Sequence, residues 1–143
     1  MRNTEREINR KAANMFNIIK VKTTSKVEAK DITDEVLKAV RGKDGRILNV
    51  YTPHTTCGLV INEDADPNVM RDIIEGLERL APRNHPYRHM EGNSDAHIKS
   101  TLTGCSLMIP FSEGKPMLGQ WQGIFLMEFD GPRERKVFLT LIQ

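Results

Sequence analysis

The C-terminal third of the chain is a succession of strand-like segments separated by short turns. Residues 105–111, 119–129 and 136–142 are apolar runs, and turn sequences at 112–116 and 131–132 separate them. Runs rich in β-branched and aromatic residues between glycine and proline turns are typical of strands. Gly123 lies inside the second run, where it predicts a bulge or bend. This third therefore requires a sheet whose strands are mostly joined by short turns.

The first two thirds add both strands and helices. Residues 16–24 and 46–52 predict half-buried or buried strands, and a shorter apolar run covers residues 59–61. A helix is expected from Thr33 to Gly42, and a longer one follows Asp66, with Pro67 in its first turn. A short helix could form over 96–102. About six or seven strands and two clear helices give an α+β fold.

Length and charge limit the class of protein. The chain has 143 residues, which suits one domain, and its 38% hydrophobic and 28% charged residues are typical of a globular protein. The net charge is +2, and residues 1–14 carry four cations and two acids, so the rest is neutral (+2 − 2 = 0). We expect no nucleic-acid partner, because such proteins need a basic face.

Other features of the sequence bear on the cellular compartment and on how the chain divides into domains. No apolar run approaches the roughly 18 residues of a membrane span, and no signal-peptide pattern opens the chain, so we expect a cytoplasmic protein without a membrane partner. Cys57 and Cys105 lie among apolar neighbours and are expected to be reduced thiols packed as small hydrophobic residues. Residues 1–15 are treated as an extension, helical or frayed, and residues 16–143 as the domain.

Two polar segments are not explained by core packing. Residues 89–100 read HMEGNSDAHIKS, and residues 54–64 place a second polar cluster between two apolar runs. Phosphate-binding GxxxxGK[ST], GxGxxG, GxSxG and HExxH motifs are all absent, which disfavours the enzymes that use them. These segments are either solvated surface loops or parts of a functional site.

Histidines are the first candidates for chemistry in these segments. His54, His89 and His97 lie in polar contexts, and imidazole binds zinc and transfers protons near neutral pH. Three histidines on separate segments could converge on a metal ion, although the spacing is not diagnostic of a ligand set. The alternative is that one or more are surface or capping residues, and His85 is assigned to the surface.

Other polar residues also have two interpretations. Glu63 and Glu91 are candidate general acids or bases. Alternatively, Glu63 bonds the backbone at the end of a strand, and Glu91 is solvated. Lys99, Ser100 and the pair Thr55-Thr56 could bind an anion through charge and hydroxyl groups, or be solvated.

Trp121 and Gln122 form the third candidate segment. On a strand over 119–129, Gln120 and Gln122 would share one face, with Trp121 on the other. The indole is expected to pack, while Gln122 is the more interesting candidate for a site.

Three motifs together resemble a known family. The segments HTTCGLVINED (54–64), EGNSDAHIKS (91–100) and GQWQGIFLMEFDGPR (119–133), in this order, are similar to the YjbQ family, also called secondary thiamine-phosphate synthases. The resemblance covers residues 16–143. It implies a mostly antiparallel β-sandwich or barrel-like body with two main helices packed on it, a homotrimer, and a polar pocket within or between subunits.

The resemblance also implies roles for individual residues. The catalytic residues would be His54, Glu63 and His97. The substrate-binding residues would be Thr55, Thr56, Asn62, Asn93, Lys99, Ser100, Trp121 and Gln122. Gln120 stands where the family often has threonine.

The implied activity is a weak thiamine phosphate synthase reaction on small phosphorylated molecules. It joins a pyrimidine carried as its pyrophosphate to the nitrogen of a thiazole phosphate and releases pyrophosphate, usually with a divalent cation such as magnesium. The chain has no obvious carboxylate pair for magnesium. The alternatives are a zinc-dependent hydrolase-like enzyme using His54, His89 and His97, and a non-catalytic trimeric ligand-binding protein.

Overall fold

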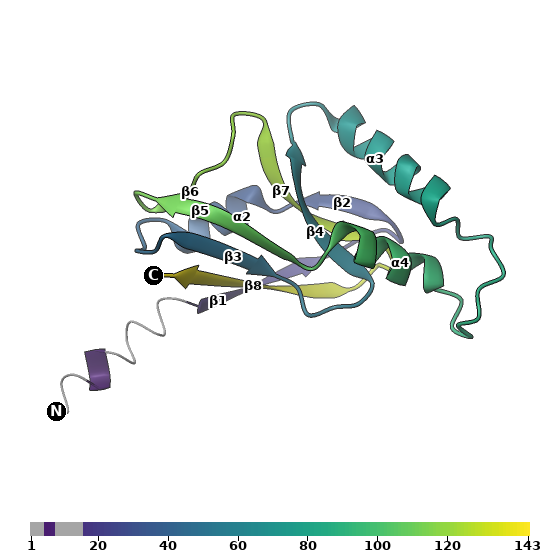
Figure 1. Cartoon of the computed structure of the whole chain (residues 1–143), viewed down its shortest axis with the longest axis horizontal. Helices are drawn as coiled ribbons and strands as arrows, with labels where there is room; N and C mark the ends of the chain where they lie inside the picture. The colour runs from purple at the N-terminus through teal and green to yellow at the C-terminus, as the bar shows by residue number, and fades with distance from the viewer. Residues whose placement is uncertain (1–4, 8–15) are drawn as a thin grey trace.

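A computed structural model describes residues 5–7 and 16–143 (Figure 1). The expected extension over residues 1–15 lies mostly outside these ranges. The strands are β1 (Phe16–Lys22), β2 (Glu28–Asp31), β3 (Ile47–Tyr51), β4 (Cys57–Glu63), β5 (Ser106–Ser112), β6 (Lys115–Pro116), β7 (Gln122–Glu128) and β8 (Glu134–Ile142). The helices are α2 (Thr33–Val40), α3 (Pro67–Leu80) and α4 (Ser94–Thr103). Within these ranges, no helix has both the length and the apolar character needed to cross a membrane.

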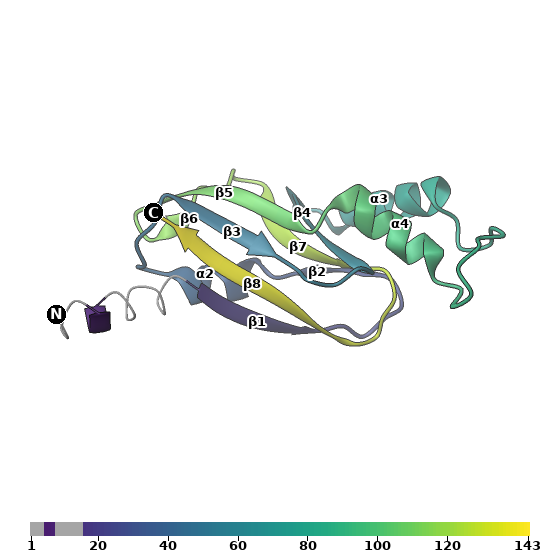
Figure 2. The same ribbon diagram turned by 60° about the horizontal axis from the view of Figure 1, so that its bottom comes forward.

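The strands form two antiparallel sheets. The larger sheet has the order β1-β8-β3-β5-β6 and the smaller one the order β2-β7-β4. The two sheets pack face to face, with α3 and α4 beyond the smaller one (Figure 2). The expected α+β fold with antiparallel sheets is therefore confirmed.

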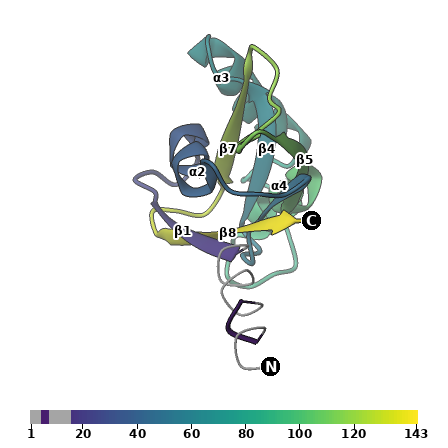
Figure 3. The ribbon, with the colours of Figure 1, turned by 90° about the vertical axis from the view of Figure 1, so that its left-hand side faces the viewer.

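Strand β7 is buried on both faces. Ile124 and Leu126 face the core between the sheets, whereas Phe125 and Met127 face a second core beneath α3 and α4. This explains why residues 122–128 read as a continuous apolar run rather than as an alternating one. Helix α2 lies at one open side of the sandwich, where Val36 and Val40 join the central core (Figure 3).

Three local predictions were incomplete or wrong. The polar strand β2 was not predicted, because EAKD has no apolar alternation. The short helix expected over 96–102 is the ten-residue α4, which begins at Ser94. Gln120 and Trp121 precede β7 instead of lying on it, because Gln122 closes a turn through its N–H to the Gly119 carbonyl (3.1 Å). The predicted division of these side chains between two strand faces was therefore wrong.

A buried ion pair joins the two sheets at one end of the sandwich. Glu128 on β7 and Arg135 on β8 are 0% and 1% exposed. Arg135 Nη2 and Nε donate to Glu128 Oε2 (2.5 Å) and Oε1 (2.9 Å). The carboxylate also accepts from Thr23 Oγ1 (2.8 Å) and from the N–H groups of Phe129 and Asp130 (3.1 and 3.2 Å). Such complete hydrogen bonding is what makes a buried charge tolerable.

We predict that Glu128→Gln and Arg135→Met each lower the free energy of unfolding by about 3–5 kcal/mol, because either change leaves a buried charge without its partner. The double variant should cost less than the sum of the two. Chemical denaturation measures both. The exposed neighbour Glu134→Gln is the control and should stay within about 0.5 kcal/mol of the parent. Single variants as stable as this control would contradict the prediction.

Candidate functional site

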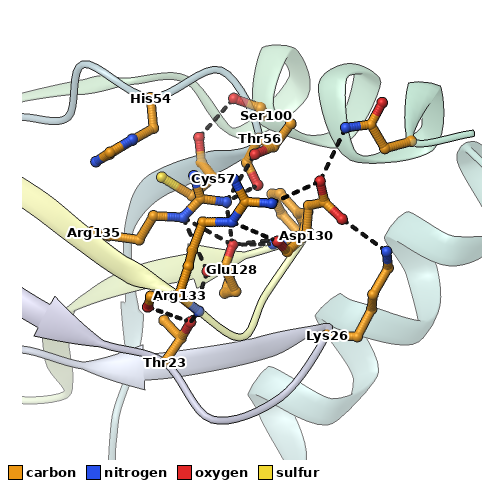
Figure 4. Close-up of polar contacts among 12 residues, drawn as sticks. Thr23, Lys26, His54, Thr56, Cys57, Ser100, Glu128, Asp130, Arg133 and Arg135 are labelled. Atoms are coloured by element: carbon orange, nitrogen blue, oxygen red, sulfur yellow. Dashed lines mark hydrogen bonds and ion pairs between the residues drawn. The ribbon is translucent and has the colours of Figure 1, made fainter. Parts of the chain in front are cut away.

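The first motif surrounds the buried ion pair. Thr56, just before β4, accepts hydrogen bonds from Arg135 Nη2 at its hydroxyl (2.8 Å) and its carbonyl (3.2 Å). The guanidinium therefore fixes the chain immediately after His54 (Figure 4). Thr55 is exposed. Cys57 is buried, and burial raises the pKa of its thiol, so it is an inert packing residue as expected. The same expectation was wrong for Cys105, which is exposed just before β5.

His54 is held as a neutral imidazole. Its Nε2 accepts the backbone N–H of Lys136 (2.9 Å), which requires that this nitrogen carry no proton. Burial, and then the positive charge of Arg135, lower the pKa of His54 below its usual 6.5, although Glu128 opposes them. A catalytic role for His54 would therefore have to use Nδ1.

The start of α4 is tied to the turn that follows β7. Asn93 Nδ2 donates to Asp130 Oδ2 (3.0 Å), and Asp130 also pairs with Lys26 (2.7 Å) and Arg133 (3.1 Å). Burial alone would raise the pKa of Asp130, but the hydrogen bonds from Lys26 and Asn93 outweigh it and lower the pKa. Asn93 Oδ1 is buried without a hydrogen-bond partner among the described residues.

Two predicted substrate ligands in the second motif already have partners inside the chain. Ser100 Oγ donates to the Cys57 carbonyl (2.6 Å) and joins α4 to β4. Lys99 is 2% exposed, and its ammonium binds the Glu78 carboxylate on α3 and lies 3.5 Å from Asp95. The bond from Lys99 lowers the pKa of Glu78. Both side chains therefore hold α4 in place.

A cleft of about 580 Å³ lies between α4 and the loop that precedes it. Its lining includes three of the four histidines of the chain, His85, His89 and His97, together with Arg88. The rings of His89 and His97 are 5.4 Å apart, and His89 Nε2 lies 3.7 Å from Glu91. Tyr87, Pro86, Ser94 and Ile98 complete the lining. His85, assigned to the surface from the sequence, thus belongs to this cleft.

The predicted metal site of His54, His89 and His97 is not assembled. His54 is bonded to the β8 backbone, whereas the other two line the cleft. In the described part of the chain, no three histidine, cysteine or acidic side chains are placed to hold one metal ion. These donors within one chain do not fit zinc or magnesium, so no step below is routed through a metal.

Trp121 and Gln122, near the start of the third motif, lie at the other end of the smaller sheet. Glu63 pairs with Gln122 and Cys57 with Glu128, so β4 separates the two ends by six residues, about 20 Å. Asn62 Oδ1 accepts the Glu63 N–H (2.8 Å), Gln122 Oε1 accepts the Gly119 N–H (2.8 Å), and Trp121 is 58% exposed. One chain therefore keeps Trp121 and Gln122 away from His54, although Glu128 and Asp130 of the same motif meet the first motif at Cys57 and the second at Asn93.

Several residues of these sites were missed in the sequence. They are Thr23, Lys26, Arg88, Asp130, Arg133 and Arg135. Arg135 carried a usable signal, because it falls in the alternating register of the buried Val137, Leu139 and Leu141. Asp130 and Arg133 also carried a signal, because they lie within the third motif, 119–133. Thr23, Lys26 and Arg88 had none, since their partners lie far away in the chain or in an irregular loop.

We predict that stability falls as pH drops below 6.5 and that His54 causes part of the loss. A lowered pKa in the folded state means that the unfolded chain binds the proton first, so acid favours unfolding from 6.5 down to the folded pKa. Above 6.5 neither state is protonated at this residue. The lowered pKa values of Asp130 and Glu78 act separately, below 3.8 and 4.5.

Denaturation midpoints between pH 8 and pH 5 measure this effect. His54→Gln should flatten the curve in this range, and the exposed His85→Gln should leave it unchanged. Parallel curves for His54→Gln and the parent would show that the imidazole does not contribute.

Comparison with known proteins agrees with the motifs. Residues 17–143 match the family described as "UPF0047 protein YjbQ-like". A UPF0047 protein of Methanocaldococcus jannaschii is 52% identical over 125 residues, covering 85% of this chain and 90% of the relative. The UPF0047 protein YugU of Bacillus subtilis is 42% identical over 132 residues, covering 90% and 99%.

Solved structures show the same fold. An uncharacterised conserved protein of the YjbQ/UPF0047 family from Clostridium acetobutylicum has a TM-score of 0.84 at 48% identity, covering 88% of this chain and 99% of its own. A protein of unknown function from Sulfolobus solfataricus has a TM-score of 0.84 at 33% identity, covering 90% and 96%. From its motifs, fold and relatives, this chain belongs to the YjbQ (UPF0047) family.

Proposed function

We propose that this protein is a small-molecule enzyme that binds a phosphorylated substrate in the histidine-lined cleft. The observation that carries the proposal is the convergence of His85, His89, His97 and Arg88 on one cleft of about 580 Å³. A guanidinium offers paired donors to a phosphate, and imidazoles can bind the anion or transfer a proton near neutral pH.

The N-terminus of α4 and an aromatic ring complete this chemistry. Ser94, the first residue of α4, lies in the lining, so free N–H groups of the first helical turn are close to the cleft. Helix N-termini favour anions. Tyr87, whose ring lies 4.8 Å from that of His85, provides a face against which a substrate ring could stack. The cleft therefore suits an aromatic molecule that carries phosphate or pyrophosphate.

Weak thiamine phosphate synthase activity is the reaction that we propose for this site. As the C–N bond to the thiazole nitrogen forms and the C–O bond to pyrophosphate breaks, Arg88 and the histidines would neutralise the departing pyrophosphate, and His89 or His97 would donate a proton to it. The geometry supports the binding step most directly, because all of these side chains line one cleft.

We further propose a homotrimer in which a second copy completes the site. Within one chain the exposed Trp121 lies beside the Glu63 end of β4, about 20 Å from the Cys57 end that follows His54. Ile98 and Leu102 are exposed on α4 beside the cleft and offer an apolar surface to another chain. A neighbouring copy that supplied Trp121 and Gln122 would cover this surface and place these two side chains at the cleft.

Calorimetric titration with pyrophosphate tests the anion site. Arg88→Gln and His97→Gln should each weaken binding about tenfold, because each removes one charged or hydrogen-bonding contact. Arg79→Gln on α3 removes a cation outside the lining and should bind like the parent. Equal affinities in all four proteins would exclude this cleft as the anion site.

A synthase assay with both substrates tests turnover. The parent should form thiamine phosphate slowly, and His97→Gln should lower the rate by about 10²-fold or more if its imidazole transfers a proton. Pyrophosphate binding without turnover in the parent would favour the non-catalytic ligand-binding alternative.

Sedimentation and subunit mixing test the assembly. The parent should sediment at three times the mass of one chain. The inactive variants Trp121→Ala and His97→Gln are dissociated, mixed and reassembled. If the site is shared between copies, activity should return, since some interfaces then combine an intact His97 from one chain with an intact Trp121 from another. A monomer, or a mixture as inactive as its components, would contradict the shared site.

A further inference from the structure

A second cavity lies at the opposite end of α3 from the histidine cleft. It has a volume of about 410 Å³ and lies between the N-terminal half of α3 and the outer face of the smaller sheet. Its apolar lining comprises Val27, Ala29, Met70, Ile74 and Phe125, and we call this cavity the α3 crevice. Its size is within the range of about 300–1,000 Å³ that is usual for small-molecule sites.

The charged lining of the α3 crevice has one dominant sign. It comprises five carboxylates and one cation, a balance of −4 (−5 + 1): Glu28, Asp31, Glu63, Asp64, Asp66 and Arg71. The Arg71 guanidinium donates to Asn68 Oδ1 (3.2 Å) and forms no ion pair with any described residue. Arg71 therefore does not neutralise the rim.

The carboxylates have only neutral partners or none. Asp31 accepts from Thr33, Glu28 from Thr24, and Asp66 from the N–H of Asn68. The side chains of Glu63 and Asp64 have no hydrogen bond or ion pair within residues 5–7 and 16–143. Among the rim residues Glu28 and Glu63 are half-buried, and Asp31, Asp64 and Asp66 are exposed. Other half-buried or buried acids of the described chain pair with cations, as in Glu128–Arg135, Asp130–Lys26 and Glu78–Lys99. An apolar floor with an uncompensated negative rim is complementary to a cation that has an apolar body.

The spacing of the carboxylates distinguishes between kinds of cation. No three acidic side chains of the described chain are close enough to hold one metal ion. Glu28 and Asp31 lie at the two ends of β2, about 10 Å apart along the strand, and Glu63 lies across the sheet at the end of β4. Charges distributed in this way match separate positive groups on one elongated molecule better than a single ion.

We propose that the α3 crevice binds a linear diamine or polyamine. The methylene chain lies on the floor formed by Ala29, Met70 and Phe125, and the ammonium groups lie at the carboxylate rim. This arrangement buries the apolar part and leaves the charges hydrated, as lysine side chains do on apolar protein surfaces. The α3 crevice shares no lining residue with the histidine cleft, so this site does not depend on the function proposed above.

Binding of a matched ligand series tests the proposal. The probes are 1,6-diaminohexane, hexylamine and hexane-1,6-diol, which share a six-carbon body and carry two, one and no positive charges. Affinity measured by calorimetry at low salt should fall about three- to tenfold with each lost ammonium group, and added salt should weaken the diamine most. Equal binding of the diol and the diamine would overturn the proposal.

Variants identify the site. Glu63→Gln with Asp64→Asn should weaken diamine binding about tenfold or more, because the two unpaired carboxylates are lost. Asp72→Asn with Glu75→Gln removes the same charge from exposed positions of α3 outside the lining and should bind like the parent. The same loss in both double variants would show a non-specific effect of net charge and overturn the site.

Two further measurements complete the test. Ala29→Phe fills the floor without changing charge, so it should abolish diamine binding in a protein whose circular dichroism matches the parent. Should this variant not fold, the carboxylate variants still decide. Magnesium ions should not displace the diamine at equal concentration, and stoichiometric displacement would indicate a metal site instead.

Discussion

The Glu128–Arg135 pair is the interaction on which the arrangement of this protein depends. It joins the two sheets inside the sandwich, and both partners use their remaining hydrogen-bonding capacity on neighbouring segments. Arg135 holds Thr56 and so places the His54 segment, whereas Glu128 binds the N–H groups of Phe129 and Asp130. Breaking this pair would therefore disturb the first motif and the turn that anchors α4, as well as the contact between the sheets.

From that turn, a chain of polar contacts leads to the histidine cleft. Asp130 binds Asn93 at the start of α4, and Ser100 and Lys99 then fix the helix against β4 and α3. Four of the eight polar residues of the segment 89–100 are thus structural: Asn93, Asp95, Lys99 and Ser100. His89, Ser94 and His97 are the members that line the cleft, so the segment both builds the scaffold and supplies the site.

The sequence predicted the secondary-structure elements better than it predicted which residues contact one another. Apolar periodicity located the strands and α3, and three motifs identified the family. Lys99 was assigned to an anion because nothing local shows that Glu78 lies beside it. His54 and Glu63 are close in sequence, yet extended β4 carries them to opposite ends of the sheet, since a strand lengthens by about 3.3 Å per residue. Strand register and long-range packing decide which side chains lie close together, and the local sequence pattern shows neither.

Helix α3 connects the two cavities physically. Met70 is its one buried residue and forms part of the α3 crevice, while Glu78 near the other end holds Lys99 of α4, whose His97 lines the cleft. Ile73, Ile74 and Leu77 of the same helix pack partly buried against the core beneath α3 and α4, so α3 would move as a unit rather than locally. If a ligand in the α3 crevice changes the position of α3, and with it the affinity of the cleft, then a ligand in the cleft must change the affinity of the crevice by the same factor. Ligands of the two cavities at the ends of α3 would therefore act either independently or reciprocally, and the Glu78–Lys99 contact is the link between α3 and α4 through which a reciprocal effect would pass.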